Sequence, residues 1–320
     1  MIKYSFIIPV KAINDYIRES VPKILAIKRD DFDIIIYPDE LSLESWAKTK
    51  QIATGHVGPA EKRTRAIADA QGEYLIFIDD DAYPESNILD VLDKDFIDVN
   101  IAAIGGPAIT PPDDSFWQKV SGAVFLSSFS GGFPERYVPV GQKKNVADWP
   151  SVNFSIRKNI FTELGGFNCK FWPGEDTKLC LDILESGKGK ILYDPDLTVY
   201  HHRREGLARH LKQISGYGLH RGFFAKKFPQ TSFKFKYFLP SLFLLFFTIG
   251  LLGSLFFELV FKLYLAGLFL YILVLIKAFF DIKKYVKISV TLGALYYIFF
   301  THLVYGFSFL RGLIIQDLKT

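Results

Sequence analysis

The chain is poor in cysteine and carries little net charge, and each shortage excludes a class of protein. Cys169 and Cys180 are its only cysteines in 320 residues, and their spacing fits neither a metal site nor a disulfide scaffold. This cysteine usage favours a reducing compartment. A net charge of +4 indicates anionic lipid or phosphate as a partner and not nucleic acid. No signal peptide is expected, because the short N-terminal apolar run contains Pro9.

Hydrophobic residues make up 49% of the chain, which is high for a soluble enzyme. They are concentrated toward the C-terminus, where charged residues are scarcest. Three apolar runs cover residues 238–257, 259–280 and 288–310, each near the ~20 residues that cross a hydrocarbon core. Lysines precede the first run and separate the second from the third, so both basic segments are predicted to be cytoplasmic. Three spans would leave the C-terminus outside, whereas a re-entrant third run would return it inside.

The most informative stretch is the apolar run Tyr74–Ile78, which ends in three carboxylates. Its aromatic and β-branched residues predict a buried strand. Ligands bind outside the carboxyl ends of strands in open α/β sheets, so Asp79, Asp80 and Asp81 should meet a substrate there. Asp79 and Asp81 form an Asp-x-Asp pattern, which suits Mg²⁺ or Mn²⁺ held against a diphosphate. The same acids could instead form a turn that caps the following helix.

Two earlier strands are predicted to end at the same edge of the sheet. The first is Ser5–Val10, which stops at Pro9, and the second is Asp33–Tyr37, with a helix around Asp15–Leu25 between them. Strand, helix and strand imply a right-handed parallel crossover. This crossover places Pro9, Asp39 and the acidic cluster along one edge.

A helix that begins near Gly58 carries the cations Lys62, Arg63 and Arg65. These could face a diphosphate, but a charged helix face is more often solvated, and this pattern alone predicts solvent exposure.

Two further acids, Glu175 and Asp176, follow a Pro-Gly turn and precede a helical pattern over Thr177–Leu184. The helix dipole favours acids in a first turn, which would explain them without a function. Alternatively, one of them is the general base that removes a proton from an acceptor hydroxyl.

Two more strands are predicted, at Lys190–Tyr193 and at Leu197–His202. The second of them ends in two histidines, His201 and His202. A histidine at a strand end is usually a surface or packing residue, although histidine also suits Mn²⁺. The segment Arg203–Phe228 mixes basic and apolar residues. It predicts a helix that lies in the membrane interface or packs on the preceding domain.

In combination these motifs resemble the family 2 glycosyltransferases, which have the GT-A fold. The resemblance covers Tyr4–His202 in the family's order. It rests on the opening strand, Pro38-Asp39-Glu40, Arg63-Thr64, Gly72–Asp81, Asn153–Lys158, Leu164–Asn168 and Pro173–Leu179. The resemblance implies an α/β class with a Rossmann-like, mainly parallel sheet. Together with the hydropathy it predicts a GT-A domain over residues 1–204, an amphipathic interfacial segment over 205–236 and a transmembrane region over 237–320.

The resemblance also implies a role for individual residues. Asp176 would be the general base, and Glu175 would orient it or the acceptor. The metal ligands would be Asp79, Asp81 and His201, with His202 as the alternative to His201. The donor would be bound by Pro9, Asp39, Arg63, Asp79 and Asp80. The acceptor side would include Trp149, Asn153, Gln213 and Tyr217.

Two of these acceptor-side assignments depend on weaker signals. In this fold the region Phe116–Val140 lines the acceptor side, where aromatics such as Trp117, Phe133 and Trp149 could stack on sugars, although each could equally be a core residue. Gln213-Ile-Ser-Gly-Tyr217 falls where processive family members carry Gln-x-x-Arg-Trp, with the Arg and the Trp replaced.

We therefore predict a membrane-anchored, metal-dependent, inverting glycosyltransferase. It would move a sugar from a nucleotide-diphosphate donor to a lipid-linked or cell-surface glycan acceptor at the cytoplasmic leaflet. A processive polysaccharide synthase is the nearest alternative, but the altered motif and the few spans disfavour it, unless a homo-oligomer forms a channel. A non-catalytic scaffold should have lost the acids, and a transporter subunit should carry paired charges within its spans, which are nearly absent.

Overall fold

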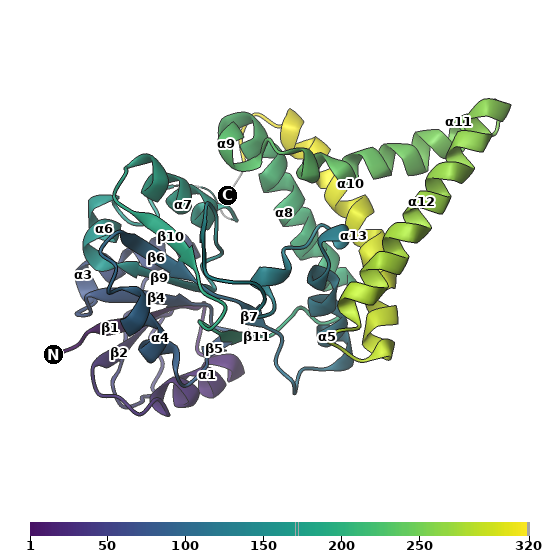
Figure 1. The fold of residues 1–320 in the computed structure, drawn as a ribbon. Coiled ribbons are helices and arrows are strands. Elements are labelled where there is room, and N and C mark those ends of the chain that lie inside the picture. The colour runs from purple at the N-terminus through teal and green to yellow at the C-terminus, as the bar shows by residue number, and fades with distance from the viewer. Residues whose placement is uncertain (170, 172, 319–320) are drawn as a thin grey trace. The chain divides into compact units, whose positions relative to one another are not determined.

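The computed structural model describes residues 1–169, 171 and 173–318, which form two compact units (Figure 1). Unit 1 holds Met1–Pro111 and Val138–His202, and unit 2 holds Pro112–Tyr137 and the described chain from Arg203 onward. The sequence predicted boundaries at residues 204 and 236, with the segment 112–137 in the first domain. The structure differs because the segment 112–137 packs with the C-terminal helices.

Unit 1 is built on an eight-stranded sheet with the order β3-β2-β1-β4-β9-β6-β10-β8. The strands are β1 (Tyr4–Pro9), β2 (Phe32–Tyr37), β3 (Thr49–Gln51), β4 (Tyr74–Ile78), β6 (Ile101–Gly105), β8 (Lys144–Val146), β9 (Asn153–Arg157) and β10 (Lys190–Tyr193). β1 pairs in parallel with β2 and β4, while β9 and β8 run antiparallel to their neighbours. The predicted α/β class with a mainly parallel sheet is confirmed.

A second sheet consists of three short strands, and its strand β5 follows β4 closely in the sequence. Its order is β5-β11-β7, formed by β5 (Ala82–Pro84), β11 (Val199–His201) and β7 (Ala108–Ile109). β11 pairs antiparallel with β5, so that His201 lies opposite Ala82. This pairing returns the last strand of unit 1 to the acidic cluster.

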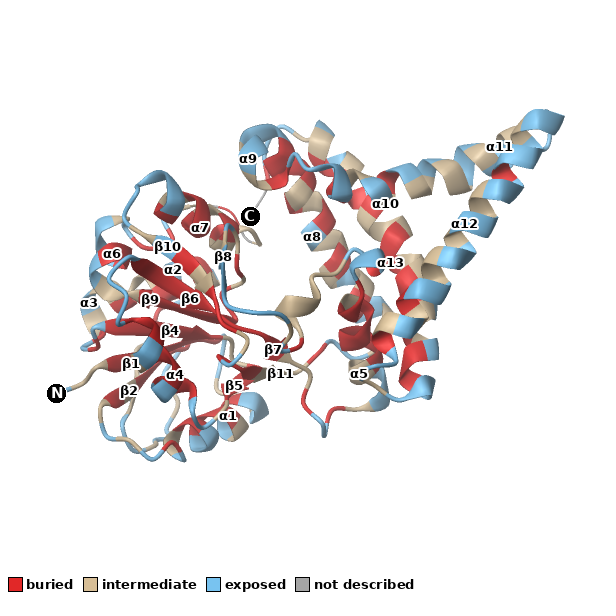
Figure 2. Ribbon diagram, in the orientation of Figure 1, coloured by how far each residue is buried: buried red, intermediate tan, exposed pale blue. Residues whose placement is uncertain are grey.

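Helices of unit 1 cover both faces of the large sheet. They are α1 (Asp15–Leu25), α2 (Pro59–Thr64), α3 (Ala66–Asp69), α4 (Ile88–Asp95), α6 (Lys158–Glu163) and α7 (Glu175–Glu185). Along β1, Phe6 and Ile8 belong to one buried apolar cluster and Ile7 to the other. Burial on both faces explains why β1, β4 and β6 are continuous apolar runs in the sequence, and Figure 2 shows these strands buried.

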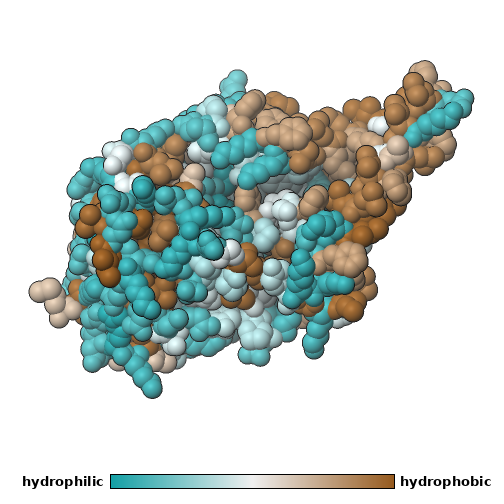
Figure 3. Space-filling view, viewed as in Figure 1, coloured by the Kyte–Doolittle hydropathy of each residue, from teal (hydrophilic) through white to brown (hydrophobic). Residues whose placement is uncertain are grey.

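Unit 2 is helical. It contains α5 (Phe116–Ala123), three 3-10 turns (Val124–Leu126, Ser128–Ser130 and Pro134–Arg136), α8 (Leu207–Lys227), α9 (Pro229–Ser232), α10 (Phe235–Leu245), a π turn (Phe246–Gly250), α11 (Leu251–Ser254), α12 (Glu258–Ile282) and α13 (Ile288–Ile314). Three helical stretches are long and apolar enough to cross a membrane: Phe235–Ser254, Glu258–Ile282 and Ile288–Ile314. Figure 3 shows apolar side chains gathered over α10, α11 and α12.

α8 packs backbone to backbone against α13. A Cβ at Gly222 would lie 2.1 Å from the carbonyl oxygen of Phe309, and one at Gly312 would lie 2.1 Å from that of Leu219. Small residues allow such close approach in helices that cross membranes. The sequence predicted that α8 would lie in the interface or on the preceding domain, and in the structure its buried side packs on α13.

A buried histidine explains why the segment 112–137 belongs to unit 2. His210 of α8 places Nδ1 2.8 Å from Oγ of Ser121 in α5 and Nε2 2.9 Å from Oγ1 of Thr301 in α13. Burial lowers the pKa of His210 to about 4, so the ring is neutral at pH 7. A neutral imidazole can donate to one hydroxyl and accept from the other, which joins the three helices.

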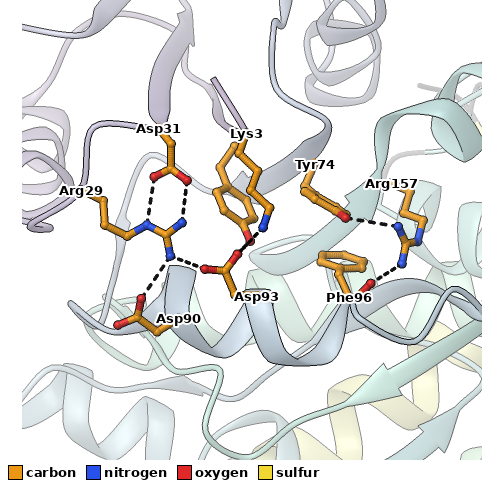
Figure 4. Close-up of polar contacts among 9 residues, drawn as sticks. Lys3, Arg29, Asp31, Tyr74, Asp90, Asp93, Phe96 and Arg157 are labelled. Carbon is orange, nitrogen blue, oxygen red and sulfur yellow. Dashed lines mark hydrogen bonds and ion pairs between the residues drawn. The ribbon is translucent and has the colours of Figure 1, made fainter. Parts of the chain in front are cut away.

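Ionic contacts tie α4 to the start of β1, at the opposite edge of the sheet from the acidic cluster (Figure 4). Asp93 accepts from Nζ of Lys3 at 2.5 Å, from the hydroxyl of Tyr4 at 2.6 Å and from Arg29 at 2.5 Å. Burial acts to raise the pKa of Asp93, but the bonds from Lys3, Tyr4 and Arg29 outweigh it and lower the pKa to about 2.

Asp93→Asn should therefore destabilise the protein at neutral pH. A carboxyl whose pKa is lowered on folding adds stability above its unfolded pKa and loses it as pH falls toward about 2. Because the carboxyl is one-third exposed, we expect about 1 kcal/mol, or about 2–4 °C in melting temperature. The difference should shrink as pH falls below about 4. Asp90→Asn is the control, since Asp90 is 66% exposed, and an equal loss there would contradict the assignment.

Candidate functional site

The acidic cluster lies at the sheet edge that the sequence predicted. β2, β1 and β4 are neighbours and run in parallel, so their carboxyl ends meet at one edge. Pro9 is the buried last residue of β1, Asp39 follows β2, and Asp79 follows β4.

Asp79, Asp81 and His201 form a group that could hold a metal ion. Each offers one ligand atom, and these atoms all lie within 4.8 Å of one another. Nε2 of His201 is 3.1 Å from Oδ1 of Asp81. Two carboxylate oxygens and one imidazole nitrogen fit a divalent ion such as Mn²⁺, and fit Mg²⁺ less well because Mg²⁺ prefers oxygen ligands.

Strand register explains why His201 joins this group and His202 does not. His201 pairs with Ala82, next to Asp81, and successive side chains of a strand point to opposite faces. His202 accordingly meets a different set of residues: its Nε2 is 3.0 Å from Oε2 of Glu19, and its ring lies 4.8 Å from that of Tyr16. Its backbone N–H donates to the carbonyl oxygen of Asp81.

The middle acid of the cluster is held apart from the metal group. Oδ2 of Asp80 accepts from Nδ2 of Asn14 at 2.7 Å. Oδ1 of Asn14 in turn accepts from the backbone N–H of Ile17 and caps α1. One asparagine therefore fixes the start of α1 and the orientation of Asp80, a role that the sequence analysis missed.

Arg63 links the metal group to α7. Its guanidinium donates to Oδ1 of Asp79 at 2.5 Å and to Oε1 of Glu175 at 3.1 Å, and its Cζ lies 5.7 Å from the centre of the Phe167 ring. The side chain is 5% exposed, and its Nε has no hydrogen-bond partner among the described residues. This burial contradicts the solvated helix face that the charge pattern predicted.

The two acids of α7 differ in environment. Burial, with a smaller effect of the Asp176 charge, raises the pKa of Glu175 to about 7 although Arg63 opposes it. Asp176 is half-buried, and its Oδ1 accepts from the N–H of Thr177 at 2.7 Å. Both acids occupy the first turn of α7, so the helix dipole favours their charged forms.

A second buried cation holds the acid after β2. Nζ of Lys62 is paired with Oδ1 of Asp39 and also donates to the carbonyl oxygens of Val10 at 2.6 Å and Tyr37 at 3.3 Å. His56 places Nδ1 2.7 Å from Oδ2 of Asp39. The bond from Lys62 lowers the pKa of Asp39, which is therefore charged at neutral pH. The predicted solvent exposure of Lys62 is wrong as well.

Two of the residues predicted to face the acceptor are buried in unit 1. The Asn153 side chain is fully buried and donates to the carbonyl oxygens of Pro107 at 3.0 Å and Leu197 at 2.6 Å. Trp149 is 2% exposed, and its Nε1 donates to the carbonyl oxygen of Gly106 at 3.0 Å. Both side chains bond to the backbone within unit 1, and their acceptor-side role stays a prediction.

The remaining acceptor-side residues lie on α8 in unit 2. Gln213 is half-buried and Tyr217 is exposed, and their role stays a prediction.

Replacing Arg63 by Gln should produce a loss of stability that grows with pH. Without the cation, burial would raise the pKa of Glu175 above about 7. A carboxyl with a raised folded pKa costs stability that increases as pH rises from its unfolded value through its folded one. We therefore expect the difference in melting temperature from wild type to be larger at pH 8 than at pH 5.5, by about 2–4 °C.

The matched control is Arg65→Gln on the neighbouring turn, because Arg65 pairs with exposed Glu61 and contacts neither acid. It should show no pH-dependent difference. An Arg63→Gln penalty that is identical at both pH values would contradict the proposed coupling of Arg63 to Glu175.

Comparison with known proteins identifies relatives of unit 1. Residues 5–165 match the family model described as Glycosyl transferase family 2. A stretch of 161 residues is 27% identical to the Pre-mycofactocin glycosyltransferase of Mycobacterium tuberculosis, over 50% of this chain and 33% of that protein. The chain thus spans about a third of the length of the first relatives that it matches.

A relative from Methanococcus voltae is matched over more of its length. The Dolichyl N-acetyl-alpha-D-glucosaminyl phosphate 3-beta-D-2,3-diacetamido-2,3-dideoxy-beta-D-glucuronosyltransferase is 20% identical over 68% of this chain and 70% of its own. Among solved structures, the mannosyltransferase PcManGT of Pyrobaculum calidifontis, in complex with GDP-Man and Mn²⁺, has a TM-score of 0.49 at 16% identity. It covers 69% of this chain and 62% of that one.

Proposed function

Because the chain belongs to glycosyl transferase family 2, we propose that unit 1 is the GT-A catalytic domain of an inverting glycosyltransferase that uses a nucleotide-diphosphate sugar. The observation that carries the proposal is the convergence of Asp79, Asp81 and His201 at one sheet edge, linked through Arg63 to the acids of α7. The relatives from Mycobacterium tuberculosis, named as a glycosyltransferase, and from Methanococcus voltae, named as a glucuronosyltransferase, support it.

The donor would lie across the carboxyl ends of β1, β2 and β4. Asp39 is charged and is held by Lys62 at Oδ1 and by the exposed His56 at Oδ2, so a nucleobase that bonds Asp39 would share these oxygens or displace His56. Pro9 would form the floor between Asp39 and the acidic cluster. Arg63 has both of its terminal nitrogens engaged by carboxylates, so we assign it to holding Asp79 and Glu175 and not to the donor itself.

The residues present fit a divalent metal. Asp79, Asp81 and His201 supply two oxygens and a nitrogen within reach of one ion. When bound, Mg²⁺ or Mn²⁺ would neutralise the diphosphate leaving group as a Lewis acid. The histidine ligand favours Mn²⁺ of the two.

Asp176 is the general base in this proposal. It is half-buried in the first turn of α7, where the helix dipole favours its charged form. It would remove the proton from the acceptor hydroxyl, which attacks the anomeric carbon from the face opposite the leaving group. Inversion follows from that single displacement. Glu175 is buried against Arg63 and therefore positions the first turn of α7 instead of meeting the acceptor.

The acceptor would be presented by a membrane. Three apolar helical stretches are long enough to anchor the chain, and lysines before the first and between the second and third predict that unit 1 is cytoplasmic. A lipid-linked acceptor is favoured because the name of the Methanococcus relative includes a dolichyl phosphate sugar.

The proposed metal site can be tested by comparing variants of His201 with variants of His202. Asp81→Ala and His201→Ala should abolish the Mn²⁺-enhanced affinity for a nucleoside diphosphate, measured by calorimetry on the full chain. His202→Ala is the matched control and should keep the enhancement, because His202 faces Glu19. Equal affinity with and without Mn²⁺ in the wild type would refute the metal assignment.

The base assignment predicts a different phenotype for Asp176→Asn. Asparagine preserves the size of the side chain but cannot take the proton, so turnover should fall by about 10²–10⁴. Nucleotide affinity and Mn²⁺ dependence should stay within roughly threefold of wild type, under about 1 kcal/mol. NMR of the product should show the anomeric configuration opposite to that of the donor. Near-normal turnover, or a product with retained configuration, would overturn the mechanism.

A further inference from the structure

Unit 2 carries a cluster of cations at the start of its first apolar helix, separate from the acids of unit 1. Its members come from three segments that are distant in sequence. They are Arg136 in the last 3-10 turn, Arg221 in α8, and Lys234 and Lys236 at the start of α10. We refer to these four residues as the α10 cation cluster.

Two aromatic rings hold the members of the cluster together. Lys236 Nζ lies 3.9 Å and Arg136 Cζ lies 4.8 Å from the centre of the Phe133 ring. Arg221 Cζ lies 5.2 Å and Lys236 Nζ lies 5.4 Å from the centre of the Tyr237 ring. Each ring thus serves two cations, because its negative face attracts both. Lys236 belongs to both pairs, which brings three cations together around it.

Four cations that gather at the start of α10 make this part of unit 2 attractive to an anion. Lys234 is the N-cap of α10 and makes no side-chain capping bond, so the positive end of the helix dipole adds to the cluster. Guanidinium groups and a helix N-terminus are the donors that bind phosphate oxygens most readily.

The surroundings indicate a phosphate that belongs to a lipid. Phe233 and Phe235 alternate with the two lysines and are 65% and 73% exposed. The stretch that can cross a membrane, Phe235–Ser254, begins at the cluster itself. Exposed aromatics beside cations at the end of a span are typical of the lipid headgroup region, where anionic lipids attract basic residues. A soluble phosphate would make no apolar contact with these two exposed phenylalanines, whereas the acyl chains of a lipid would.

We propose that the α10 cation cluster binds the phosphate headgroup of an anionic membrane lipid. Arg136 and Arg221 contact its oxygens, Lys234 and Lys236 supply further charge, and Phe233 and Phe235 insert beside its acyl chains. The inference depends only on unit 2, so it stands independently of the transfer reaction assigned to unit 1.

The test is native mass spectrometry of the detergent-purified full chain titrated with phosphatidic acid or phosphatidylcholine. The wild type should retain phosphatidic acid and discriminate against phosphatidylcholine. The double variant Arg136→Gln and Lys236→Gln should bind phosphatidic acid about thirtyfold more weakly, which is what two cations near an anionic surface contribute. The double variant Arg136→Lys and Lys236→Arg, which keeps both charges, should restore most of the affinity.

The matched control is Lys283→Gln, because Lys283 also lies over an aromatic ring, 4.3 Å from the centre of Phe280, but outside the cluster. It should bind phosphatidic acid like wild type, and unchanged helicity and nucleotide affinity in the glutamine double variant would show that it is folded. The proposal is overturned if that folded variant binds like wild type or if Lys283→Gln loses as much affinity. It is also overturned if inorganic phosphate displaces phosphatidic acid at equal concentration, which would indicate a soluble ligand.

Discussion

The arrangement of unit 1 depends on a buried guanidinium between two carboxylates. Arg63 is 5% exposed and bonds Asp79 on the metal side and Glu175 on the α7 side. Burying the arginine without an anion would cost several kcal/mol, and so would keeping Glu175, which is 6% exposed, charged without a cation. Asp79 is 31% exposed and supplies the second anion, so Arg63 links the metal group to the first turn of α7. Asp176 is positioned for its proposed role because its neighbour Glu175 cannot move independently.

Unit 2 depends instead on close backbone contact. Glycines on α8 and α13 leave no space for a side chain between the helices, and the neutral ring of His210 adds polar bonds to α5 and α13. α13 is accordingly more buried than the other two helices that could cross a membrane, with 39% of its most apolar window buried against 17% and 6%. Most of the surface of those two helices is left for contact with lipid, as the exposed residues of α12 in Figure 2 indicate.

The two units gather charges of opposite sign. Unit 1 gathers carboxylates, which suit a metal ion and a proton acceptor. Unit 2 gathers cations around Phe133 and Tyr237 at the start of α10, which suit a lipid phosphate. The opposite charges fit the two separate proposals, a metal-dependent transfer in unit 1 and an anionic lipid bound by unit 2.

The sequence by itself determined what depends on local pattern. The apolar runs of β1 and β4, the helix Asp15–Leu25, the acids after β4 and the three apolar helices all lie where periodicity and composition predicted them. Only the tertiary structure decided which charges are buried, because Arg63 and Glu175 are 112 residues apart and no local pattern records their pairing. It also decided that His201 joins the metal group, since strand register selects one of two adjacent histidines, and that Asn153 and Trp149 are core residues. Segment 112–137 joined unit 2 for the same reason: its partners His210 and Thr301 are brought near only by packing.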